Sequence, residues 1–254
     1  MRLAFALAAL LLAALPARSE EVLAGLSQTA LALTATFTGS EILVFGAVRR
    51  DAPIPDDAEP LHVIVTIEGP PQRLSVWRKG RVGGIWMNVE EVRVARAPSL
   101  YAVASTAPLE QILSSTEDLR HSISIPRAIR SFGTMAMAAD APRFVEALIR
   151  LRREDGLFTE TPNGMQVQQE TLFSGTLELP ANLIEGSYRA RVFLTRGGQV
   201  VDQYETAIEV RMAGLERWLS TLARDVPLAY GLLAVLIAVA AGWSASAAFR
   251  ALQR

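Results

Sequence analysis

Apolar and polar residues alternate along several stretches of this chain, and a period of two residues is typical of a half-buried β-strand. The stretches with this pattern are residues 31–37, 61–69, 172–180 and 187–212. The last of them has Gly197-Gly198 near its middle, so it predicts a long hairpin. Residues 41–48 are apolar with almost no break, which predicts a central strand covered on both faces.

A second hairpin is predicted over residues 72–94, where glycines supply the turn or a bulge: Gly80, Gly83 and Gly84. The same stretch combines aromatic and basic side chains: Trp77, Arg78, Lys79, Arg81 and Trp86. Fixed cations beside exposed backbone N–H groups and aromatic rings are typical of a partner or anion surface. The alternative, which the pattern favours, is a structural hairpin whose tryptophans fill the core while its charges stay in solvent.

Helices are predicted over residues 108–113 and 141–155. The longer helix can be capped by Asp140 and ended by Gly156. Its apolar residues recur at i, i+3, i+4 and i+7 and predict a core stripe: Phe144, Ala147, Leu148 and Leu151. Its arginines are interleaved with acidic residues and predict a solvated face: Arg143, Arg150, Arg152 and Arg153.

Strand signals on both sides of these helices predict a mainly β fold. We expect an immunoglobulin-like β-sandwich over residues 20–212, with a helical insertion at about residues 107–160. Two small domains divided near residue 120 are the alternative. A run of small residues over 98–106 predicts that another segment packs closely over Tyr101.

Both ends of the chain carry apolar segments that predict a membrane location. Residues 1–19 have the layout of a cleaved secretory signal peptide, with an uncleaved anchor as the alternative. Residues 227–249 contain no charge, and as a helix of about 34 Å they exceed a hydrocarbon core of about 30 Å. A juxtamembrane amphipathic helix over 213–226 precedes this span, and residues 250–254 form a cytoplasmic stub.

This order of segments predicts a single-pass protein of the cytoplasmic (inner) membrane. The signal peptide would carry the N-terminal domain into the periplasm, and residues 227–249 would lie in the lipid bilayer. The C-terminus would then remain in the cytoplasm.

The amino-acid composition argues against several classes of function. Lys and Arg total 25 against 26 Asp and Glu, so the formal net charge of −1 does not suit a nucleic-acid-binding surface. The chain has no cysteine, which excludes thiol catalysis and thiolate-bound zinc. Only His62 and His121 offer imidazole groups, and common catalytic and nucleotide-binding motifs do not occur. We therefore expect no catalytic activity, no cofactor and no metal site.

Three phrases follow one another along the chain: FTGSEILVFGAV (37–48), VTIEGPPQRLSVWRKGRVGGIWMN (65–88) and PSLYAVAST (98–106). Together they resemble the putative transmembrane protein family of alphaproteobacteria, whose members have a signal peptide, an exported domain and a C-terminal span. The resemblance covers nearly the whole mature chain and implies no catalytic or ligand-binding residue. It also implies a loose association with permeases of the TauE/SafE type, which export sulfite or organosulfonates.

Three functions remain open at this stage. The first is a membrane-anchored periplasmic accessory or interaction protein that partners an inner-membrane protein, such as a permease, through Trp77, Arg78, Lys79, Arg81 or Trp86. The second is a periplasmic subunit that binds an anion, for example a sulfur oxyanion, for a TauE/SafE-type permease. The third is a hydrolase that depends on His121, which lies near Asp118 and several serines.

Overall fold

The computed structural model describes residues 20–34, 36–50, 59–129 and 141–252 of the 254-residue chain. The strands in these ranges are β1 (Glu20–Leu26), β2 (Ala30–Leu33), β3 (Ser40–Arg50), β4 (His62–Glu68), β5 (Pro71–Val82), β6 (Ile85–Pro98), β7 (Tyr101–Ser105), β8 (Phe158–Pro162), β9 (Met165–Gln168), β10 (Leu172–Leu179), β11 (Gly186–Arg196) and β12 (Gln199–Met212). The helices are α2 (Leu109–Ile112), α3 (Ser115–His121), α4 (Ile125–Ala128), α6 (Ala141–Glu154), α7 (Leu215–Asp225) and α8 (Pro227–Leu252). The predicted signal peptide and the predicted cap at Asp140 lie outside the described residues.

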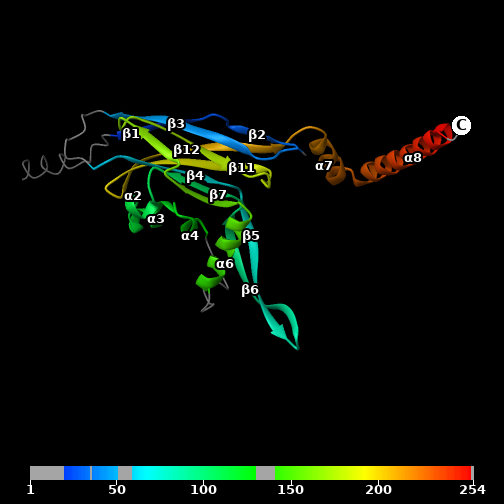
Figure 1. Ribbon diagram of the computed structural model, residues 1–254, viewed down its shortest axis with the longest axis horizontal. Coiled ribbons are helices and arrows are strands. Elements are labelled where there is room, and N and C mark those ends of the chain that lie inside the picture. The colour runs from blue at the N-terminus through cyan, green and yellow to red at the C-terminus, as the bar shows by residue number, and fades with distance from the viewer. Residues whose placement is uncertain (1–19, 35, 51–58, 130–140, 253–254) are drawn as a thin grey trace, which may run out of the picture.

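Two sheets face each other and form the body of the protein (Figure 1). One has the strand order β1-β3-β10-β9, and the other has the order β2-β12-β11-β4-β7-β8. The predicted hairpin at 187–212 is confirmed as β11 and β12, which turn at Gly197 and Gly198 with φ values of 59° and 74°. The strand predicted at 31–37 is shorter and ends at Leu33. The mainly β fold is thus confirmed, and its immunoglobulin-like detail stays a prediction.

The hydrophobic core lies between the facing sheets. Alternate residues of each strand point inward, because successive side chains of a strand lie on opposite faces. The inner face of the six-stranded sheet contributes Val63, Val65, Ile67, Tyr188, Ala190, Val192 and Leu194. The four-stranded sheet contributes Val22, Ile42, Val44, Phe173 and Leu177 to the same cluster.

The prediction that the apolar run 41–48 is covered on both faces is wrong. Its strand, β3, is central within its sheet, and Ile42 and Val44 are buried in the core. Leu43 and Phe45 point to the other side and are exposed, since no described element covers the outer face of this sheet. The Phe45 ring lies instead along β1, within 3.2 Å of where a Cβ of Gly25 would stand. An unbroken apolar run therefore marks an exposed apolar face here, and not a second buried one.

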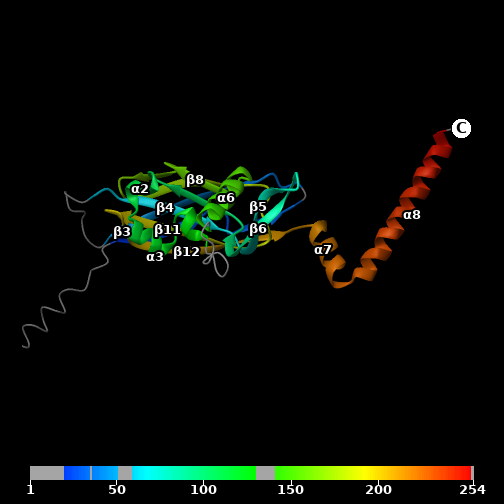
Figure 2. The same cartoon turned by 90° about the horizontal axis from the view of Figure 1, so that it is seen from below.

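The helices between β7 and β8 cover the outer face of the six-stranded sheet (Figure 2). The helix predicted at 108–113 is confirmed as α2. Tyr101 is fully buried, and its hydroxyl donates a 2.7 Å hydrogen bond to the carbonyl oxygen of Ile123. The predicted packing of another segment over Tyr101 is thereby confirmed. After α6 the chain returns to the same sheet, because β8 pairs in parallel with β7.

The predicted helix at 141–155 is confirmed as α6, and Gly156 follows it with a φ of +70°. Phe144 and Leu148 are buried, as the apolar stripe predicts. Leu151 is exposed, so its predicted place in the core is wrong. The buried part of the stripe ends before the last turn of the helix.

Two helices follow β12 and lead away from the sheets (Figure 1). α7 corresponds to the predicted juxtamembrane helix, and its Trp218 is exposed. α8 contains a 20-residue stretch, Pro227–Ser246, with a mean hydropathy of 2.0 and no burial against the rest of the protein. By length and composition this stretch could cross a membrane, as the sequence predicts.

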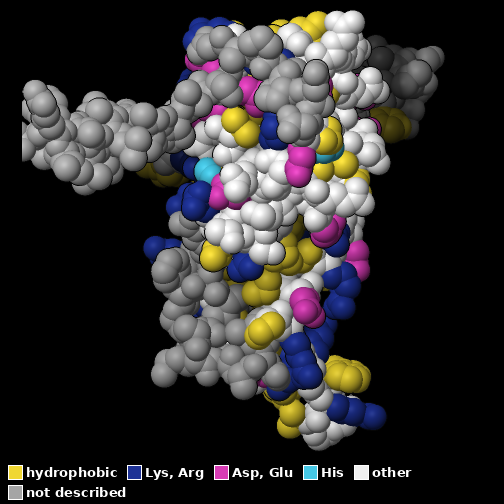
Figure 3. All heavy atoms as spheres, turned by 90° about the vertical axis from the view of Figure 1, so that its left-hand side faces the viewer, with side chains coloured by type: hydrophobic (Ala, Val, Ile, Leu, Met, Phe, Trp, Pro, Cys, Tyr) yellow, Lys and Arg dark blue, Asp and Glu magenta, His cyan; other side chains and the backbone are white. Residues whose placement is uncertain are grey.

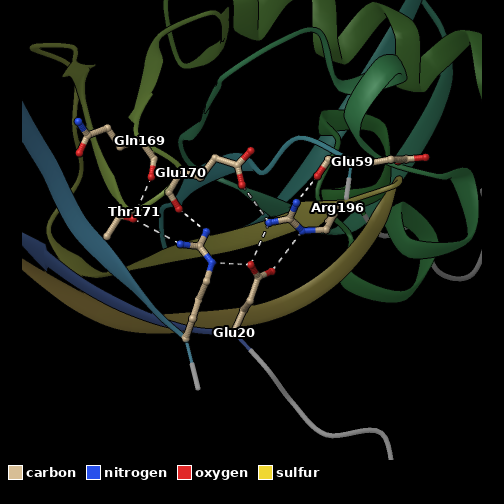
Figure 4. A network of polar contacts seen from close by, with 7 residues as sticks. Glu20, Glu59, Gln169, Glu170, Thr171 and Arg196 are labelled. Carbon is tan, nitrogen blue, oxygen red and sulfur yellow. Dashed lines mark hydrogen bonds and ion pairs between the residues drawn. The ribbon is translucent and has the colours of Figure 1, made fainter. Parts of the chain in front are cut away.

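A buried network of charges joins the two sheets at the end where β1 begins (Figure 4). Glu20 is only 8% exposed, and one of its carboxylate oxygens accepts hydrogen bonds from Arg50 at 2.8 Å and Arg196 at 2.9 Å. Arg50 lies opposite Glu20 on β3, whereas Arg196 belongs to β11 in the other sheet. Burial raises the pKa of Glu20, but the hydrogen bonds and charges of Arg196 and Arg50 outweigh it and hold the pKa below its ordinary value of 4.5.

We expect Glu20→Gln to lower the free energy of unfolding by about 2 kcal/mol at pH 7, because it removes the buried carboxylate that two partly buried guanidinium groups share. The lowered pKa means that this stabilisation is present above pH 4.5 and is lost as the pH falls through the folded-state pKa. Urea unfolding of the full-length protein in detergent, followed by circular dichroism, measures both effects. The control is Glu21→Gln, which removes an exposed ion pair with Arg49 and should cost less than about 1 kcal/mol. An equal loss in both variants would contradict the prediction.

Candidate functional site

The predicted hairpin at 72–94 is confirmed as β5 and β6, which pair over almost their whole length. Its turn is Gly83-Gly84, where both residues have positive φ values, 59° and 87°. Two-residue turns of this kind suit glycine and match the twist of paired strands. The base of the hairpin is anchored by Val76, Val92 and Val94, which are buried. Beyond them the two strands project from the body of the protein (Figure 1).

The sequence interpretation that the two tryptophans of this hairpin fill the core is wrong. Trp77 is 48% exposed and Trp86 is 68% exposed. The physical reason is the length of the strands, which carries their outer halves beyond the sheets that could cover them. The tip also exposes other apolar side chains: Val82, Ile85 and Met87. Hydrophobic and basic side chains gather at this end in Figure 3.

The five residues predicted as a partner or anion surface fall into two groups. Trp77, Arg78 and Lys79 line a groove between the hairpin and helix α6. Arg81 and Trp86 lie opposite each other beside the turn, outside that groove. The Nε atom of Arg81 donates a 3.4 Å hydrogen bond to the carbonyl oxygen of Gly84.

We call the space between β5 and α6 the hairpin groove; it has a volume of about 270 Å³. Its apolar lining comes from Val76, Trp77, Phe144 and Ala147, and its basic lining comes from Arg78, Lys79, Arg143 and Arg150. Arg78 also pairs with Glu90 across the hairpin at 2.5 Å. The groove therefore combines an apolar floor with four cations.

Sequence reasoning assigned Arg143 and Arg150 to a solvated helix face and missed their part in the groove. Both are exposed, as expected, but they also stand beside Trp77. The helical period does place these two arginines together: residues 143, 147 and 150 lie on one side of a helix, next to Phe144. Only the position of the hairpin, more than sixty residues earlier in the chain, turns that side into a groove wall.

The two histidines take part in local hydrogen bonds and ion pairs. His62 Nδ1 lies 3.0 Å from the hydroxyl of Thr106, and burial together with the charge of Arg196 lowers the pKa of His62. His121 Nε2 lies 3.3 Å from a carboxylate oxygen of Glu117. Asp118 instead accepts hydrogen bonds from the backbone N–H and the hydroxyl of Ser124. Within the described residues, no serine hydroxyl bonds the His121 ring, so the arrangement does not form a Ser-His-Asp relay.

Comparison with protein families gives a match over most of the chain. The sequence model of a family described as "Putative transmembrane protein (Alph_Pro_TM)" matches residues 21–251. A search of the curated proteins finds no match to this chain. Among solved structures, the sporulation control protein Spo0M of Bacillus subtilis is similar at 11% identity and a TM-score of 0.29. That match covers 80% of this chain and 54% of Spo0M, so the chain spans about half of that protein.

We expect Trp86→Ala to change the free energy of unfolding by less than about 0.5 kcal/mol, because an exposed side chain away from caps and ion pairs carries little stability. Val92→Ala on the same strand should cost about 2 kcal/mol, since it removes buried methyl groups and leaves a cavity. Chemical unfolding of the two full-length variants beside the unmodified protein measures this difference. A large loss of stability in Trp86→Ala would show that the tip is packed.

Proposed function

The chain belongs to this transmembrane family, and on that premise we propose that it is a membrane-anchored interaction protein without catalytic activity of its own. Its partner is a neighbouring protein of the inner membrane, such as a permease. The exported sandwich binds an acidic, apolar segment of that partner in the hairpin groove. The observation that carries the proposal is the exposed hairpin, which places an apolar floor and four cations beside each other.

Charge complementarity specifies the chemistry of the bound segment. Arg78, Lys79, Arg143 and Arg150 around one small groove favour carboxylates, and opposite charges across an interface speed association and exclude wrong partners. The apolar floor around Trp77 and Phe144 supplies the area that buried anchor residues of a partner would fill. An amphipathic segment with acidic and apolar faces satisfies both requirements.

The position of the domain also supports a partner in the membrane. Only Ala213 and Gly214 separate β12 from α7, and only Val226 separates α7 from α8. With α8 in the bilayer and the N-terminal part exported by the signal peptide, these short connections hold the sandwich near the periplasmic surface. The groove then lies within reach of the exposed loops of other membrane proteins.

Photo-crosslinking in intact cells tests the proposal. A photoreactive phenylalanine analogue in place of Ala147 puts the reactive group in the groove of the full-length, C-terminally tagged protein. We expect one membrane-protein adduct, whose crosslinked peptide is rich in acidic and apolar residues. Adding Arg143→Glu and Arg150→Glu should reduce its yield about ten-fold or more, since reversing two groove charges should cost at least about 1.4 kcal/mol of binding.

The matched control is Arg49→Glu, which reverses an exposed arginine on the opposite sheet and should leave the adduct unchanged. Equal adduct in the groove variant and the control would contradict the proposal. So would an adduct at a peptide without acidic residues, or an adduct with lipid alone.

A further inference from the structure

A second basic site lies on the outer face of the six-stranded sheet, separate from the hairpin groove. It is a pocket of about 150 Å³ enclosed by β4, β6, β11, α3 and α4. We call it the arginine pocket, because four of its lining residues are arginines: Arg96, Arg120, Arg189 and Arg191. The carboxylate that lines it is Glu68, and His121 is also part of the lining. It shares no lining residue with the hairpin groove.

Arg191 is the most unusual of these arginines because it is only 9% exposed. Its Nη atoms donate to the carbonyl oxygen of His121 at 2.7 Å, and to the Tyr101 hydroxyl and the carbonyl oxygen of Ser122 at 3.2 Å each. Its Nε–H has no hydrogen-bond partner among the described residues, and no carboxylate there forms an ion pair with it. A buried guanidinium with an unpartnered N–H and no ion pair is costly, so this group favours an anion beside it.

The surrounding groups hold Arg191 in one place. Its guanidinium carbon lies 5.1 Å from the centre of the Phe193 ring, which the His121 ring meets edge-on. A cation over an aromatic face is attracted by the ring, and the hydrogen bond to the carbonyl oxygen of His121 also holds the guanidinium. The guanidinium is therefore oriented in advance of any ligand.

Carboxylates near the pocket neutralise only part of its charge. Glu68 forms an ion pair with Arg189. Glu117 lies outside the lining, on α3, and pairs with Arg120 at 2.5 Å and with His121 at 3.3 Å. Glu205, which lies across from Arg191 on β12, acts on Arg189 through its charge. Arg96 and Arg191 retain positive charges that these contacts do not balance.

We propose that the arginine pocket binds a small tetrahedral oxyanion, the chemistry shared by sulfate and phosphate. Guanidinium groups reach it from β6, α3 and β11, and a tetrahedral ion presents oxygens toward all three directions, whereas a planar carboxylate presents two. Cavities of about 150 Å³ hold ligands with six heavy atoms, so the volume is sufficient. This inference goes beyond the proposed function, because it does not depend on the hairpin or on a partner protein.

Isothermal titration of the full-length protein in detergent, with sodium sulfate or sodium phosphate against sodium chloride of equal ionic strength, tests the proposal. We expect saturable binding of one ion per chain by at least one of the two oxyanions, and their relative affinities show which one the pocket prefers. The midpoint temperature of thermal unfolding should rise with the concentration of the same ion, over the concentration range in which the titration shows binding.

Arg96→Ala and Arg120→Ala should each weaken binding about ten-fold or more. Both arginines are exposed, and Glu117 keeps His121 as a partner when Arg120 is removed, so we expect both variants to fold. Arg191→Lys keeps the charge but loses the planar fork and should also weaken binding. The matched control is Arg127→Ala on α4, an exposed arginine outside the pocket, which should bind like the unmodified protein.

Three results would overturn the proposal. The first is that sulfate and phosphate produce no more heat and no more stabilisation than sodium chloride does. The second is that the Arg96→Ala and Arg120→Ala variants bind the oxyanion as tightly as the Arg127→Ala variant does. The third is that acetate binds while neither tetrahedral ion does, which would assign the pocket to carboxylates. None of these results depends on the photo-crosslinking of the hairpin groove, so the two proposals fail separately.

Discussion

The structure depends on the six-stranded sheet being covered on both faces. Its inner face meets the four-stranded sheet through apolar residues such as Val65 and Val192. Its outer face meets the helices between β7 and β8, and there the strands place polar groups, including Glu68 and Arg191, under a helical layer. The outer face also buries apolar side chains, such as Ile64 and Phe193, so polar and apolar groups are held together under the helices.

The helical insertion between β7 and β8 contributes to both basic sites. α6 supplies one wall of the hairpin groove, and α3 and α4 supply one wall of the arginine pocket. The opposite walls come from strands, namely residues 76–79 of β5 in the first case and β4, β6 and β11 in the second. Without the insertion, the strand residues of both sites would lie on open surfaces. The helices therefore turn these two basic surfaces into a groove and a pocket.

The sequence predicts the local secondary structure well, but it predicts poorly which elements cover each face of a strand or helix. Period-two alternation and glycine pairs at 83–84 and 197–198 located both long hairpins, because these signals act within a few residues. The same alternation could not show what covers each face, so the exposure of Trp77 and Phe45 was missed. The arginine pocket could not be predicted from the sequence, since strand register brings Arg189 and Glu68 together across more than a hundred residues. One local signal was overlooked: Ser114 and Glu117 form the start of α3 in a pattern typical of helix caps.

The short connections from β12 through α7 to α8 have a consequence for how strong any contact must be. A domain tied closely to a helix in the bilayer searches for its partners in two dimensions, within a thin layer above the surface. Confinement to one membrane raises the effective concentration of each protein for the other, because both occupy a thin layer and not the whole volume. A contact of modest intrinsic affinity can therefore persist between two proteins in one membrane and be lost when both are extracted into dilute solution.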